Sequence, residues 1–74
     1  MSAADGTGVD VATLADLLRE TEAHHGAFEA STPKHDWADW YAPYLGARLA
    51  GRTSDEATKA ADVYMEENFQ IVRQ

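Results

Sequence analysis

The sequence predicts an all-α fold, a small three-helix domain with short connections. Three segments carry apolar residues at spacings of three and four, which is the period of one helix face. No stretch of useful length alternates apolar and polar residues as a strand would, and residues that start and stop helices flank the three segments. We therefore expect helices at about 10–30, 36–50 and 54–72, within a single domain at 9–74.

The first helix is expected to begin at Asp10, whose carboxylate can accept hydrogen bonds from the backbone amides that follow. Ser31, Thr32 and Pro33 then end it. Residues 1–8 are small and polar and include glycine, so we expect a flexible N-terminal tail there. The apolar face of this helix is predicted at Leu14, Leu17, Thr21, His24 and Phe28.

The second helix has two possible starts. With Asp36 as the cap, residues 36–42 form a first turn before Pro43 removes one hydrogen bond and bends the chain. With a start at Asp39, Pro43 lies near the first turn, where a missing N–H matters less. Gly51 ends the helix in both cases.

The third helix has the clearest start. Thr53 and Glu56 match the capping box, in which each side chain accepts a hydrogen bond from the other residue's backbone amide. Asp55 and Lys59 have opposite charges and lie one turn apart. The residues at helical spacing that follow are Ala57, Ala61, Tyr64, Asn68 and Val72.

Charge and composition exclude several classes of partner. Thirteen acidic and six basic residues give a net charge of −7, which disfavours binding to nucleic acid and to anionic membranes. No apolar run approaches the roughly 20 residues that span a bilayer. The first residues have neither the basic nor the apolar region of a secretory signal, so we expect a cytoplasmic protein.

The short chain also predicts a need for extra stabilisation. A domain of about this size buries only about 60% of the surface of its unfolded chain, so a lone monomer is marginally stable. There is no cysteine, and disulfides are therefore excluded. A bound metal or a partner subunit remains as the usual alternative.

Aromatic residues gather in the second helix. On a helical wheel, nine residues of this segment fall on a continuous arc of roughly 200°, about twice the width that one neighbouring helix covers. They are Trp37, Ala38, Trp40, Tyr41, Ala42, Tyr44, Leu45, Arg48 and Leu49. Three interpretations are open: a filled core, a surface shared with a second copy or another protein, or a ligand cage. We expect Trp37 and Tyr41 to face the core and Trp40 to lie nearer the edge of the arc. The candidate interaction residues are Trp37, Trp40, Tyr41, Tyr44 and Arg48.

A second candidate site combines histidine and carboxylate side chains. Glu22, His25 and Glu29 share a helix face, and the Glu-x-x-His spacing is the one that di-iron helical bundles use. His35, after the turn, could fold back towards this face. Imidazole with carboxylate suits zinc, iron or manganese, although the same residues also occur together on solvated surfaces. The sequence gives no reason to expect any other cofactor. Asp62 and Glu66 could add oxygen ligands, and His24 is expected to be half-buried instead.

One resemblance to known proteins rests on three short runs. These are HDWADWYAPY at 35–44, GRTSDEA at 51–57 and ADVYM at 61–65. They are similar to a short helical segment at the C-terminal ends of some bacterial glyoxalase or bleomycin-resistance-like proteins, of the vicinal oxygen chelate superfamily. The resemblance implies a small helical accessory module. It carries over no catalytic or metal-binding residue, because the βαβββ modules that hold the metal in that superfamily have no counterpart here.

The sequence therefore predicts an interaction protein. Its partner is expected to be a second copy of the chain, as a homodimer, or a larger protein. The alternatives are a metal-binding helical module and a small-ligand sensor. The nucleophile and phosphate-binding motifs of common enzyme families are missing, so we do not expect the isolated chain to be an enzyme.

Overall fold

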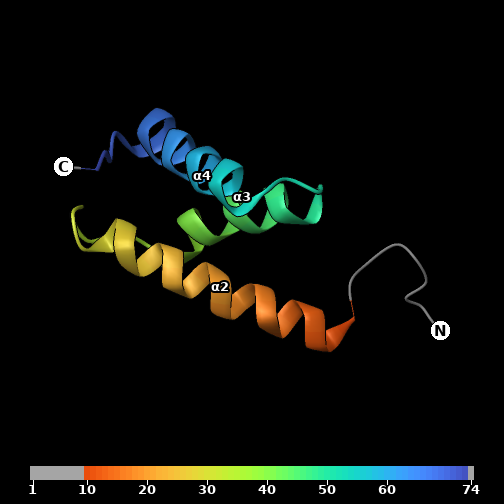
Figure 1. Cartoon of the computed structure of the whole chain (residues 1–74). Helices are drawn as coiled ribbons and strands as arrows, with labels where there is room; N and C mark the ends of the chain where they lie inside the picture. The colour runs from red at the N-terminus through yellow and green to blue at the C-terminus, as the bar shows by residue number, and fades with distance from the viewer. Residues whose placement is uncertain (1–9, 74) are drawn as a thin grey trace.

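A computed structural model describes residues 10–73 and contains three helices over that range (Figure 1). They are α2 at Val11–Glu29, α3 at Trp37–Leu49 and α4 at Ser54–Phe69. None of the described residues lies in a strand. The predicted all-α, three-helix fold is confirmed. The tail expected at 1–8 falls outside the described residues.

α2 and α4 begin at the residues that the sequence predicts, and α3 begins at the first of its two predicted starts. The Asp10 carboxylate accepts a hydrogen bond from the Thr13 amide at 2.8 Å, and the Asp36 carboxylate accepts one from the Ala38 amide at 3.1 Å. Thr53 and Glu56 form the predicted capping box. The start after Asp36 decides between the two alternatives for α3, so Pro43 lies inside the helix and not in its first turn.

The last helix ends earlier than expected. α4 stops at Phe69 because Gln70 adopts a left-handed conformation with φ of 59°. The Gln70 amide then bonds to the Glu66 carbonyl at 3.0 Å, and the Ile71 amide bonds to the Met65 carbonyl at 3.3 Å. The bond from the Gln70 amide to the Glu66 carbonyl is the one that defines the αL C-cap motif, and Ile71 packs on the core just beyond it.

α3 is the central helix, and it packs against both α2 and α4. Figure 1 shows α3 between α2 and α4, and α3 packs more extensively on α4 than on α2. Each helix contributes to the core, and two alanines one turn apart on α4 leave room for the large rings of α3. The fully buried residues of the core are Phe28, Trp40, Tyr44, Ala57, Ala61 and Met65.

The expected orientation of α3 is wrong in one respect. Trp40 is fully buried, whereas Trp37 is 60% exposed and Tyr41 is half-buried. The sequence predicts the core on the side of Trp37 and Tyr41, but α4 packs at the edge of the arc that holds Trp40 and Tyr44, next to Ala47. The small residues Ala57 and Ala61 of α4 allow a close approach there, so the aromatic edge of the arc becomes its buried centre.

Candidate functional site

Two histidines meet where α2 turns back into α3. His25 lies on the buried face of α2 and is 6% exposed. The turn after α2 is closed by the Thr32 hydroxyl, which donates a hydrogen bond to the Phe28 carbonyl at 2.9 Å. His35 follows this turn, and its Nε2 lies 2.9 Å from Nε2 of His25. The two side chains, separated by ten residues, form what we call the histidine pair.

Hydrogen bonding assigns a tautomer to each member of the histidine pair. Nδ1 of His35 lies 2.9 Å from the carbonyl oxygen of Pro33, which only accepts, so this nitrogen carries a hydrogen. The Nε2 atom of neutral His35 is then an acceptor, and His25 donates through Nε2. The ring centroids lie 5.1 Å apart, so the two rings meet nearly end to end.

Aromatic rings surround the histidine pair. The rings of Trp40 and Tyr41 lie 5.7 and 5.4 Å from that of His25, and Phe28 lies 5.3 Å from His35. Burial among them lowers the pKa of His25 below its ordinary value, and the charge of Glu29 acts in the opposite direction. His25 is therefore held in its neutral form more firmly than a solvated histidine.

The structure brings only some of the four predicted metal ligands, Glu22, His25, Glu29 and His35, into contact with one another. Among residues 10–73 no three carboxylate or imidazole side chains lie together as a ligand group. Glu22 and Glu29 are exposed, although both lie near enough to raise the pKa of Tyr41, whose main cause is burial. His25 and His35 are thus the two members of the set that come into direct contact.

A second cluster surrounds Tyr44, whose ring stacks on that of Trp40 at 5.2 Å, and it involves a residue that the sequence did not single out. The Glu20 carboxylate accepts hydrogen bonds from the Tyr44 hydroxyl and from Nε of Arg48, the latter at 2.8 Å. The bonds from Arg48 and Tyr44 lower the pKa of Glu20, while burial followed by the bond to Glu20 raises the pKa of Tyr44. The predicted half-burial of His24 is confirmed, with its ring stacked on Tyr44 at 5.4 Å.

Arg48, one of the predicted interaction residues, forms its contacts within this second cluster. Its guanidinium bonds to Glu20 and to the backbone carbonyl of Arg52, at 2.8 Å. Nothing in the sequence pairs Glu20 with Arg48, because the two residues are 28 positions apart. Their contact depends on how α2 crosses α3.

Asp62 also has a structural partner in place of a metal. Its carboxylate accepts hydrogen bonds from the indole N–H of Trp40 at 3.2 Å and from Arg73 at 2.6 Å. The guanidinium of Arg73 lies 5.3 Å from the centre of the Phe28 ring. Asp62 therefore satisfies the buried indole and holds the C-terminal segment on the core.

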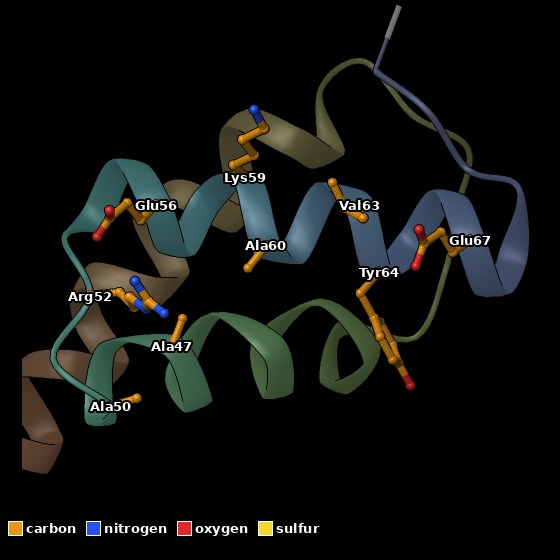
Figure 2. Close-up of a pocket in the computed structure, with 9 residues that line it drawn as sticks. All are labelled: Ala47, Ala50, Arg52, Glu56, Lys59, Ala60, Val63, Tyr64 and Glu67. Carbon is orange, nitrogen blue, oxygen red and sulfur yellow. The ribbon is translucent and has the colours of Figure 1, made fainter.

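Two apolar surfaces remain uncovered. The first, the α2 stripe, consists of Val11, Leu14 and Leu18, which are 85%, 38% and 41% exposed. The second, the α3–α4 groove, has a volume of about 560 Å³ and is shown in Figure 2. Its lining is Ala47, Ala50, Arg52, Glu56, Lys59, Ala60, Val63, Tyr64 and Glu67.

Comparisons with protein families, with curated proteins and with solved structures give no match. The resemblance to the C-terminal segments of glyoxalase-like proteins accordingly stays a prediction. None of the helices within 10–73 combines the length and the apolar character that crossing a membrane requires.

Proposed function

We propose that the protein is a small helical interaction module that pairs with a second copy of itself. The observation that supports this proposal is the α2 stripe. Three large aliphatic residues lie in a row on the half of α2 that the other helices leave uncovered, and Figure 1 shows the α2 ribbon diverging from α3 towards Val11. Each exposed aliphatic side chain gains free energy when a partner removes it from water.

The spacing of the α2 stripe supports a helical partner. The stripe continues the face that enters the core at Thr21, His25 and Phe28, with alternating steps of three and four residues. Such alternation is the pattern of a helix that packs along another helix over its full length. Within the monomer, α3 covers the half of this face that contains Thr21, His25 and Phe28. A partner helix would cover the half that contains the α2 stripe.

The α3–α4 groove has the chemistry to receive that stripe. Its floor is formed by alanines from both helices, which allow another helix to approach closely, and Val63 and Tyr64 add larger apolar walls (Figure 2). Arg52 and Lys59 line the groove and form no ion pair with the described residues. A helix from a second copy of this acidic chain supplies both an aliphatic row and carboxylates. When each copy places its stripe in the other's groove, the contact area doubles.

The aromatic residues support the proposal less directly than the sequence suggested. Trp40, Tyr44 and Arg48 are engaged within the monomer. Trp37 is the mostly exposed member of the set, with its ring packed edge-on against Tyr41 at 4.8 Å. These two side chains form a partly exposed aromatic surface at the start of α3.

Sedimentation equilibrium at micromolar to submillimolar concentrations tests the proposal. We expect a monomer–dimer equilibrium for the native chain and a monomer for Leu18→Glu, because a carboxylate in the α2 stripe cannot be desolvated at the contact. Ala12→Glu places the same charge on another face of the same helix half and should leave the dimer intact. A native chain that stays monomeric throughout, or Leu18→Glu dimers as stable as native ones, would contradict the proposal.

A further inference from the structure

We propose that His25, His35 and Glu29 form a binding site for a divalent transition metal, with Zn²⁺ as the reference ion. This inference is independent of self-association, since it concerns the other end of α2. It starts from the contact between the two Nε2 atoms, which brings two imidazole ligands from different parts of the chain to one point.

The distance between the nitrogens is close to what a metal needs. Zn²⁺ binds imidazole nitrogen at about 2.0–2.1 Å, so two nitrogens on a tetrahedral ion lie about 3.3 Å apart. The Nε2 atoms of His25 and His35 are 2.9 Å apart and need to separate by a few tenths of an ångström. His35 lies in the connection between helices and is half-buried, so its ring has room to tilt.

The bonding of His35 is that of a metal-binding histidine. Ligating histidines commonly donate their second ring N–H to a backbone carbonyl, which fixes the tautomer and aims the other nitrogen at the metal. Nδ1 of His35 does this with the carbonyl of Pro33. Its Nε2 therefore presents a lone pair to Nε2 of His25, and a tilt of the two rings would turn both nitrogens towards an ion beside that contact.

His25 becomes the second ligand by changing tautomer. In the described structure its Nε2–H donates to His35. When the metal binds, that proton leaves to water and Nδ1 takes up a proton from water, so the imidazole stays neutral and no net proton is exchanged.

Glu29 supplies the third ligand from one turn further along α2. In the described structure the Glu29 carboxylate does not lie with the two imidazoles as a ligand group, so metal binding requires this exposed side chain to rotate towards the histidine pair. A carboxylate with two imidazoles is a familiar zinc set that leaves one position for water. Glu22 flanks His25 on the other side, which makes it a matched control for Glu29.

The experiment uses untagged full-length protein freed of metal with a chelator. Zn²⁺ is titrated in competition with a chromophoric chelator, and long-range ¹H–¹⁵N spectra of the imidazoles follow each histidine. We expect one Zn²⁺ per chain, with metal-induced shifts of Nε2 in His25 and His35 and none in His24. His35→Gln should weaken binding at least about tenfold, the lower end of what losing even a supporting partner costs a metal site.

Controls separate the site from general metal affinity. His24→Gln and Glu22→Gln should bind Zn²⁺ as the native chain does, whereas Glu29→Gln should bind it more weakly, and circular dichroism verifies that each variant is folded. The proposal is overturned by an absence of saturable binding, by His35→Gln binding with native affinity, or by shifts at His24 in place of the histidine pair. Native affinity in Glu29→Gln would overturn the assignment of Glu29 as a ligand.

Discussion

At the scale of single residues, the structure depends on polar groups that are satisfied inside an aromatic core. Glu20 receives hydrogen bonds from Tyr44 and Arg48, and Asp62 receives them from Trp40 and Arg73. No fully buried side-chain nitrogen or oxygen among the described residues lacks a partner. Each carboxylate thus allows a large aromatic ring with a polar atom to be buried.

Replacing Glu20 tests the first of these networks. Glu20→Gln removes the charge that accepts three hydrogen bonds from Tyr44 and Arg48, and we expect the free energy of unfolding to fall by about 1–2 kcal/mol. Urea denaturation at neutral pH measures the change. Asp16→Asn is the control, because Asp16 pairs with Arg19 on the exposed surface and that pair contributes little. Equal effects of the two substitutions would show that Glu20 is not structurally important.

The lowered pKa of His25 predicts a pH dependence of stability. The unfolded chain takes up a proton on this residue near pH 6.5, whereas burial keeps the folded residue neutral to lower pH. Stability from this group is therefore complete above about pH 6.5 and is lost as the pH falls through that value towards the folded pKa. Urea unfolding at several pH values between 7.5 and 5 should show this decline, and His25→Gln should flatten it.

At the scale of helices, the helix starts can be predicted from neighbouring residues, whereas the side chains that enter the core depend on contacts between distant parts of the chain. The caps at Asp10, Asp36 and Thr53 depend on residues at most three positions away, so the sequence shows them. The choice between Trp37 and Trp40 for the core depends on where α4 lies, and sequence periodicity cannot supply that. The end of α4 was missed because glutamine is not a residue that usually adopts the left-handed conformation.

The same division holds for the candidate sites. The Glu22, His25 and Glu29 spacing places three side chains on one face of a helix from sequence alone, and His35 was expected to return towards it. The bond between Nε2 atoms, and the contact of Glu20 with Arg48, join different parts of the chain. The helix crossing that creates them is set by packing of the whole core.

The left-handed residue at the end of α4 gives a prediction about this element. Gln70→Gly should raise the free energy of unfolding by about 1 kcal/mol, because glycine adopts positive φ without the steric cost that a side chain brings. Glu66→Gly, on an exposed position inside the same helix, should lower it by about 1 kcal/mol. Thermal unfolding followed by circular dichroism compares the two. A loss of stability in Gln70→Gly would contradict the role given to the left-handed residue that ends α4.

At the scale of the whole molecule, the helices leave much apolar surface in contact with water. Among residues 10–73 the core holds six fully buried apolar residues, while the α2 stripe and the α3–α4 groove stay open to water. A partner that covers both surfaces would enlarge the hydrophobic core of a domain whose size makes it marginal. Self-association and stability are therefore expected to be linked.

This link predicts a melting temperature that depends on protein concentration. We expect the native chain to melt at a higher temperature at submillimolar than at micromolar concentration, because mass action favours the folded dimer. Ala60→Glu, which places a charge in the α3–α4 groove, should abolish the dependence. Ala23→Glu changes an exposed alanine of α2 to the same residue and should retain it. A native melting temperature that is constant over this range would contradict the link.

The two tryptophans lie in opposite surroundings, and their fluorescence can report on them separately. Trp40 is fully buried, with its ring 5.7 Å from His25, whereas Trp37 is 60% exposed. Iodide in solution should quench the red-shifted emission of Trp37 and leave the blue-shifted emission of Trp40 unchanged. A protonated imidazole quenches indole, so acidification should dim Trp40 before the chain unfolds. The protein thus carries one native optical probe of its surface and another of its histidine pair.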